Sequence, residues 1–331
     1  MFQRLEEPAV ARAFRTPSGL VELHEADCIR WLREQPKNSF QAVVTDPPYG
    51  MLEYTPDQMK KLRAGRGGVW RIPSAIGGHK RAPVPRFTVL RDSEVEAMYE
   101  FFREWGDVVQ PTLVPGAHIF IASSPLLSHV IAQAMSDCGY EKRGEIVRLT
   151  QTLRGGDRPK NAEEEFPDVT VMPRSAWEPW LLFRKRCEGT VAQNLRKWKT
   201  GGLRRLGETP FLDVIVSRPT RADERVLAPH PSLKPQAFLR QIVRAALPLG
   251  EGTILDPFAG SGSTLAACEA TGYRGVGVEL DPSYVTMAIT AIPLLSQLTV
   301  RQSPSASASD AAHTSGRGTQ RSRRASAHPT A

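Results

Sequence analysis

The feature that most constrains the fold is a strand that turns through a glycine-rich loop into a helix, over residues 253–271. Thr253-Ile254-Leu255 has the apolar pattern of a buried strand, and the loop has the sequence DPFAGSGST (256–264). Glycines let the backbone approach a ligand closely, and the first N–H groups of a helix are unpaired donors for an anionic group. The segment therefore predicts a ligand at the end of a strand in an α/β sheet.

The next strand indicates what kind of ligand this is. GVGVE (275–279) ends in Glu279, where a carboxylate can accept hydrogen bonds from both hydroxyls of a ribose. A dinucleotide fingerprint would need a third glycine where Leu265 stands, and no Gly-Lys-Ser/Thr follows as in a Walker loop. The two segments predict a cofactor that contains a nucleoside, and a plain tight turn is the alternative interpretation.

Strand and helix patterns alternate along the rest of the chain. Apolar strand patterns cover 20–24, 39–45, 118–122, 145–149 and 180–183. Helices are expected from about Asp27, from about Ser93, from 123 to about Cys138, and up to Pro248. Ser93 and Glu96 fit a capping box, and an apolar face follows at Val95, Met98, Phe102 and Trp105. The alternation predicts an α/β fold with a largely parallel sheet.

A second chemical motif, Asp46-Pro47-Pro48-Tyr49, stops the strand at 39–45. Two prolines can neither extend a strand nor lie inside a helix, so these residues form a rigid loop at the strand's carboxyl end. A fixed carboxylate and a proline carbonyl could accept the two N–H groups of an exocyclic amine, and Tyr49 could stack on a base outside the duplex. The alternative is a Pro-Pro turn with Asp46 as a local cap.

Charge is concentrated in three segments, although the formal net charge is only +8. Residues 51–90 hold eight Lys or Arg against two Asp or Glu, and residues 184–225 hold eleven against five. The tail 301–331 holds five Arg and one Asp. A body of neutral to acidic charge with separate basic segments is typical of a polyanion-binding protein, and solvated basic loops are the alternative.

The two motifs, in this order, resemble the permuted (beta-type) DNA amino-methyltransferases, which act on adenine N6 or cytosine N4. In that family the DPPY-type tetrad precedes the loop that binds S-adenosyl-L-methionine. Matching segments extend from about residue 20 to 290: LHEADCIRWL, VVTDPPYG, HPSLKP, ILDPFAGSGST and GVGVELDPSYV. The resemblance implies a Rossmann-like methyltransferase sheet with helices on both faces, a circularly permuted motif order and basic loop insertions.

The resemblance also implies roles for individual residues. The catalytic tetrad is Asp46, Pro47, Pro48 and Tyr49. The cofactor, S-adenosyl-L-methionine without a metal, would be bound by Asp256, Phe258, Gly260, Ser261, Gly262, Ser263, Thr264, the ribose acceptor Glu279 and, near the adenine, Asp27. His230 and Lys234 belong to the segment before the loop, and Lys234 could pair with the methionine carboxylate.

The expected substrate is an adenine N6 that is flipped out of double-stranded DNA. Asp46 favours adenine, since a serine at the first tetrad position tends to accompany cytosine in the resembling enzymes. N4-cytosine methylation by the same fold stays open. The rivals outside this reaction are an RNA or protein-glutamine methyltransferase and a catalytically idle nucleic-acid-binding protein.

The domain organisation follows from the same segments. Residues 1–300 are expected to form one catalytic domain, with 51–90 as a mobile DNA-contact loop, 184–225 as a target-recognition insertion and 230–290 as the cofactor-binding part. The tail 301–331 is too poor in large apolar residues to order itself. The chain has no signal peptide or membrane-span pattern, so a cytoplasmic location is expected. A homodimer and a cognate restriction endonuclease are conceivable partners.

Overall fold

The structure is a computed structural model that describes residues 13–48, 92–150, 156, 158–230 and 232–300. It also gives the backbone of 51–52, 75–76, 79–80 and 86–87, which form two small antiparallel pairs. Strand β4 (Met51–Leu52) pairs with β7 (Arg86–Phe87), and β5 (Ala75–Ile76) pairs with β6 (His79–Lys80). Most of the loop 51–90 and the whole tail 301–331 therefore lie outside the described residues.

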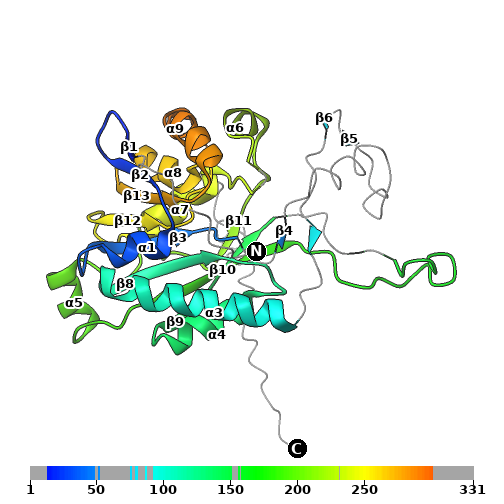
Figure 1. The fold of residues 1–331 in the computed structure, drawn as a ribbon, viewed down its shortest axis with the longest axis horizontal. Helices are drawn as coiled ribbons and strands as arrows, with labels where there is room; N and C mark the ends of the chain where they lie inside the picture. The colour runs from blue at the N-terminus through cyan, green and yellow to red at the C-terminus, as the bar shows by residue number, and fades with distance from the viewer. Residues whose placement is uncertain are drawn as a thin grey trace, which may run out of the picture.

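The other strands form one nine-stranded sheet (Figure 1). Its order is β1 (Ala13–Arg15), β2 (Val21–Glu25), β13 (Arg274–Glu279), β12 (Thr253–Asp256), β3 (Phe40–Thr45), β8 (Leu113–Ala122), β10 (Trp177–Arg184), β9 (Glu141–Leu149) and β11 (Val214–Val216). The five adjacent strands β2, β13, β12, β3 and β8 are parallel, whereas β1 and β10 run antiparallel to their neighbours. The expected largely parallel α/β fold is confirmed.

Helices cover both faces of this sheet (Figure 1). One layer holds α1 (Cys28–Arg33), α3 (Asp92–Val109) and α4 (Ser128–Asp137), and the other holds α7 (Gln236–Ala246), α8 (Ser263–Thr271) and α9 (Pro282–Gln297). A 3-10 turn, η1 (Gln110–Thr112), leads from α3 into β8. Within the described residues, no helix combines the length and the apolar character that a membrane crossing needs.

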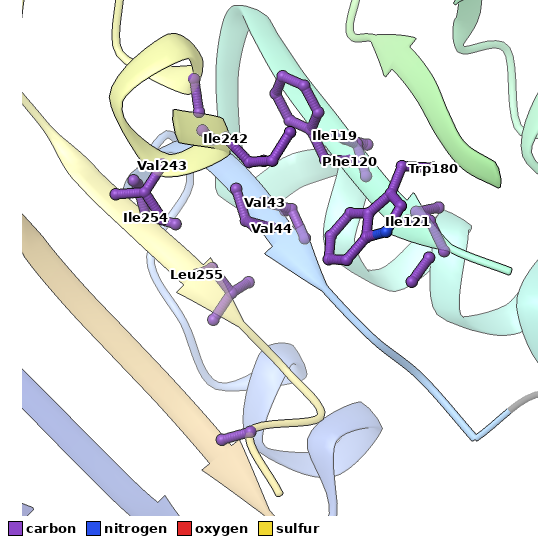
Figure 2. Packing of buried hydrophobic residues seen from close by; sticks show 14 of the residues in the cluster. Val43, Val44, Ile119, Phe120, Ile121, Trp180, Ile242, Val243, Ile254 and Leu255 are labelled. Carbon is purple, nitrogen blue, oxygen red and sulfur yellow. The ribbon is translucent and has the colours of Figure 1, made fainter. Parts of the chain in front are cut away.

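The core lies on both sides of the central strands. Val43 and Val44 of β3 and Ile254 and Leu255 of β12 are buried in one cluster with Ile242 and Val243 of α7 and Trp180 of β10 (Figure 2). The predicted apolar face of α3 is confirmed, because Met98, Phe102 and Trp105 are buried and Val95 packs against the core. Strands β3 and β12 owe their continuous apolar runs to this two-sided burial.

The basic segment 184–225 contains more regular structure than its sequence pattern indicated. It forms α5 (Val191–Trp198), β11 and α6 (Ala222–Leu227). The Thr190 hydroxyl accepts from the Gln193 N–H, and the Gln193 side chain accepts from the Thr190 N–H, so a capping box begins α5. The two helices have eight and six residues, which is too short for apolar periodicity to reveal them.

Candidate active site

The two sequence motifs meet at one edge of the sheet. Strands β3 and β12 are adjacent and parallel, with Ala42 opposite Ile254 and Val43 opposite Leu255. The carboxyl ends of adjacent parallel strands lie side by side, so the loops that follow them share one crevice. The Thr45 hydroxyl, at the end of β3, donates a 2.7 Å hydrogen bond to Oδ1 of Asp256, at the end of β12. This bond joins the tetrad segment directly to the glycine loop.

A pocket of about 340 Å³, including its open mouth, lies between these loops. Most predicted site residues line it, and they come from the tetrad, the 230–234 segment and the glycine loop. The lining residues are Asp46, Trp180, His230, Ser232, Lys234, Leu239, Asp256, Phe258, Ala259, Gly260, Ser261, Ser263 and Thr264. Pro47 is buried and Pro48 exposed beside Asp46, whereas Tyr49 lies outside the described residues.

Two glycines shape the loop beside this pocket, and Gly260 lines it directly. Gly260 and Gly262 have φ of 51° and 78°, a left-handed conformation that side chains disfavour. A Cβ on Gly260 would lie 3.3 Å from Nε2 of His230, and a Cβ on Gly262 would lie 2.5 Å from Cγ1 of Ile292. Gly262 is also the N-cap of α8, so the N–H groups of the first turn begin at the pocket. The loop therefore leaves room for a ligand next to the donors of a helix.

Glu279 supports the loop from the neighbouring strand. Its Oε2 accepts a 2.7 Å bond from the Gly260 N–H, and its Oε1 accepts a 2.8 Å bond from the Asp281 N–H. Burial raises the pKa of Glu279, and these backbone donors oppose the rise. Asp27 lies on the same side, since the Ala26 N–H bonds to the Glu279 carbonyl, and its carboxylate caps α1 through the Arg30 N–H at 2.9 Å. Neither residue lines the pocket.

His230 is held at the rim of the glycine loop. Its ring meets that of Tyr284 edge-on, with the centroids 4.5 Å apart, and its Nδ1 accepts from the Ser232 N–H at 3.2 Å. These contacts fix the ring over Gly260, which has no side chain to displace it. His230 thus closes one side of the pocket, and Phe258 closes another by packing against Phe101 and Trp105 of α3.

The carboxyl group of Asp256 is almost wholly buried, with 2% of its surface exposed. Burial raises its pKa to about 7, against hydrogen bonds from Thr45, from Thr264 and from the Phe258 N–H. A pocket lined by two acids, Asp46 and Asp256, with backbone donors at a helix start and the Glu279 carboxylate bonded to the glycine loop beside it, fits a ligand with both cationic and anionic groups. The residues present therefore fit an amino-acid–nucleoside cofactor.

Replacing Asp256 with asparagine should change how stability depends on pH. Because the folded-state pKa lies above the unfolded value, the folded protein loses stability as pH rises from about 4 to about 7. The neutral amide avoids this loss, so the melting temperature of Asp256→Asn relative to the parent should increase between pH 5 and pH 8. The difference corresponds to on the order of 2–4 kcal/mol. Melting curves of both proteins are recorded at each pH. A difference in melting temperature that stays constant from pH 5 to pH 8 would contradict the prediction.

Sequence reasoning missed a group of side chains that come from β9 and β10. Glu178 and Trp180 lie at the site because Trp180 is opposite Ala122, the last residue of β8, in an antiparallel register. The Trp180 indole N–H donates to Oε1 of Glu178 at 2.7 Å, and Nη1 of Arg148 donates to Oε2 at 3.1 Å. An acidic residue within the apolar run WEPWLLF was the signal that could have pointed to Glu178.

The basic insertion 184–225 reaches both ends of the sheet. Strand β10 ends beside the amino end of β8, where the Lys185 N–H bonds to the Ala117 carbonyl and the Asn194 amide bonds to the Pro115 carbonyl. Helix α5 lies beside β8 there (Figure 1), at the end of the sheet opposite the pocket. The chain then returns along β11, which is parallel to β9, so residues after Val216 lie at the pocket end.

Comparison with known proteins agrees with this geometry. A family described as DNA methylase, of the N6/N4 type, matches residues 40–290. The chain is 23% identical over 269 residues to the Type II methyltransferase M2.DpnII of Streptococcus pneumoniae, covering 80% of this chain and 87% of that protein. It is 34% identical to the DNA adenine methyltransferase YhdJ of Escherichia coli over 73 residues, 22% of this chain and 24% of the relative.

A solved structure shares the fold. The PvuII DNA methyltransferase (cytosine-N4-specific) superposes with a TM-score of 0.53 and 13% identity, covering 86% of this chain and 88% of that one. The expected Rossmann-like methyltransferase sheet is thereby confirmed. Since the family match spans both motifs and most of the described sheet, the chain belongs to the N6/N4 DNA methylase family.

Proposed function

We propose that this DNA methylase transfers a methyl group to N6 of an adenine flipped out of double-stranded DNA. One observation supports this most: Asp46 and the glycine loop line the same pocket. S-adenosyl-L-methionine is the methyl donor, and it supplies an electrophilic methyl group on a sulfonium when it is bound. Gly260, Ser261 and the first turn of α8 would hold it, with Glu279 at its ribose.

The residues of the tetrad prepare the amine. An exocyclic amino nitrogen is a poor nucleophile, because its lone pair is delocalised into the ring. The Asp46 carboxylate accepts one N–H and the carbonyl of a tetrad proline accepts the other, which favours a tetrahedral nitrogen with its lone pair free. Pro47 and Pro48 keep these acceptors rigid, and preorganised acceptors lose little energy to reorganisation. Alignment in one closed site supplies much of the remaining acceleration.

The Asp46 carboxylate, at the first position of the tetrad, favours adenine over cytosine as the target base. The name of the relative YhdJ specifies adenine, whereas that of the PvuII enzyme specifies cytosine N4. In the resembling enzymes a serine at the first tetrad position tends to go with cytosine, and this chain has Asp46. Methylation of N4-cytosine is the second candidate, because the fold accommodates both. A restriction endonuclease partner would fit the Type II name of M2.DpnII.

The DNA backbone would be held by the basic segments at the pocket end. Within 184–225, Arg218 and Arg225 are exposed and follow β11, at the end of the sheet where the pocket lies. The cations nearer α5 are partly engaged in the protein: Arg184 bonds to Glu141, and Lys185 bonds to two carbonyls. We therefore place target contact in residues 217–226 and in the loop 51–90. Phosphate contacts make such binding fall steeply with salt.

Nucleoside analysis tests the proposal. Plasmid DNA from a host without DNA methylation is incubated with the protein and S-adenosyl-L-methionine, digested to nucleosides and analysed by mass spectrometry. N6-methyladenine is the expected product, and N4-methylcytosine would establish the second candidate instead. A matched reaction with RNA should give no methylated nucleoside. If no modified base formed on DNA while the cofactor bound, the proposed reaction would be refuted.

A further inference from the structure

A chain of alternating charges lies behind the catalytic loop. The Lys234 ammonium contacts Oδ2 of Asp46 and lies 3.9 Å from Oε1 of Glu178. Glu178 is in turn bonded to Arg148, and Nε of Arg148 donates to the Ser217 hydroxyl at 3.0 Å. The Arg148 guanidinium also lies over the ring of Phe238, 5.2 Å from its centroid. Two anions and two cations thus alternate across β3, the segment before α7, β10 and β9.

These charges are largely out of water. The side chains of Lys234 and Arg148 are 8% and 6% exposed, and those of Asp46 and Glu178 are each 18% exposed. Buried charges persist only when they are paired and hydrogen-bonded, and removing one partner leaves a costly uncompensated charge. Lys234 lies between the two carboxylates, so its position depends on both of them. Its ammonium also faces the Ser232 carbonyl at 3.5 Å.

The contact leaves the other carboxylate oxygen for the substrate. Lys234 contacts Oδ2 of Asp46, and no donor within the described residues bonds to Oδ1, so Oδ1 is available to accept an N–H from a base amine. Building on the proposed function, we propose that Lys234 is a positioning residue for Asp46 rather than an anchor for the cofactor's carboxylate. It keeps Asp46 ionised and turned towards the amine, and Glu178, fixed by Arg148 and Trp180, holds Lys234 in place.

The electrostatics of Asp46 agree with this role. Burial raises the pKa of Asp46, and the Lys234 charge is the largest influence that opposes the rise. Glu178 raises the pKa further and Arg148 lowers it, while Asp256 faces the same carboxylate from β12. Without Lys234, burial and Glu178 would be opposed mainly by Arg148. A larger fraction of Asp46 would then be protonated and unable to accept the amine proton.

Lys234→Gln tests the role through the pH dependence of single-turnover methylation. The acid limb of the rate profile should move to higher pH by about one unit, and the plateau rate above that limb should fall at least about tenfold because Asp46 is no longer held towards the amine. Affinity for S-adenosyl-L-methionine, measured by calorimetry, should stay within about threefold, because the cofactor is not what Lys234 holds. A cofactor affinity that falls more than about tenfold while the acid limb stays in place would overturn the proposal.

A second readout needs no cofactor. In Lys234→Gln the folded-state pKa of Asp46 lies further above its unfolded value, so stability is lost as pH rises from about 4 towards that folded-state pKa. The melting temperature of the variant should therefore fall further below that of the parent at pH 8 than at pH 5. The matched control is Lys185→Gln, whose ammonium bonds to the Gln110 and Leu113 carbonyls at the opposite end of the sheet. The difference in melting temperature between Lys185→Gln and the parent should be the same at pH 5 and at pH 8.

Lys234→Arg covers the case in which the glutamine variant does not fold. It keeps the positive charge between Asp46 and Glu178, so its acid limb should stay within about half a unit of the parent's. A shift of a full unit in this variant would overturn the proposal. Failure of the parent protein to methylate DNA, or undiminished turnover after loss of Asp46, would instead count against the proposed function. The melting experiment on the cofactor-free protein still tests the Lys234–Asp46 pair in that event.

Discussion

Replacing Asp46 with alanine should lower single-turnover methyl transfer to DNA by roughly 1,000-fold, while S-adenosyl-L-methionine still binds. In the proposed mechanism the carboxylate is the acceptor that prepares the amine, so its loss should act on the chemical step. In the proposed site the cofactor would be held by the glycine loop and α8, which belong to a different strand connection. The rate is measured with radiolabelled cofactor and unmethylated plasmid DNA, and the affinity by calorimetry.

Asp46→Asn separates orientation from charge. The amide keeps an oxygen acceptor of the same shape, but it carries no negative charge and cannot take up a proton. A residual rate well above that of Asp46→Ala would assign most of the effect to orientation of the amine. Equal rates in the two variants would assign most of the effect to the negative charge of Asp46, which is paired with Lys234.

Asp137→Asn is the matched control, because it removes a carboxylate from the surface of α4, where Asp137 bonds to Tyr99 and Gln133. It should methylate DNA at the parental rate. Near-normal turnover in Asp46→Ala would contradict the mechanism, since the pocket would then prepare the amine without this residue.

The pocket could be predicted because its two motifs follow neighbouring parallel strands. The apolar runs before Asp46 and Asp256 each indicate a buried strand, and the motif order of the family places those strands side by side. The rigid tetrad and the glycine loop are local features, since proline and glycine fix backbone conformation within a few residues. The sequence therefore predicted the loops, their shared edge and most of the pocket lining.

The partners of Lys234 could not be predicted in the same way. Sequence analysis expected Lys234 to pair with the methionine carboxylate, and the structure places its ammonium against Asp46, 188 positions away in the chain. Glu178 reaches the site through an antiparallel register that long-range pairing of β10 with β8 sets. The direction of β10 also explains why the basic insertion reaches both ends of the sheet. Such contacts depend on strand direction, which local patterns do not contain.

The largest stability effect is expected at Gly262, the N-cap of α8. Gly262→Ala would add a Cβ 2.5 Å from Cγ1 and 2.8 Å from Cδ1 of Ile292, at a φ of 78°. The left-handed conformation costs about 1–2 kcal/mol for an L-residue, and overpacking a closed core costs about 1–3 kcal/mol more. Chemical denaturation should show a loss of about 2–5 kcal/mol in the free energy of unfolding.

Gly272→Ala is the matched control, because Gly272 ends the same helix at a φ of 73° with nothing within 4 Å of an added Cβ. It carries the conformational cost without the collision, so the difference between the two variants measures the contact with Ile292. In a double-mutant cycle, Ile292→Ala should recover at least about 1 kcal/mol of the Gly262→Ala loss, since it removes both colliding atoms. Equal losses at Gly262 and Gly272 would contradict the packing described here.

Comparing Gly262→Ala with Gly272→Ala also distinguishes an effect on folding from an effect on cofactor binding. An alanine at 262 must push the start of α8 away from Ile292, and that movement carries the pocket residues Ser261, Ser263 and Thr264 with it. Cofactor affinity should therefore fall at least about tenfold in Gly262→Ala at a temperature where the variant is fully folded. Gly272 lies at the far end of α8, so its variant should bind the cofactor normally. If both variants bound it equally well, the glycine loop would not be what positions the methyl donor.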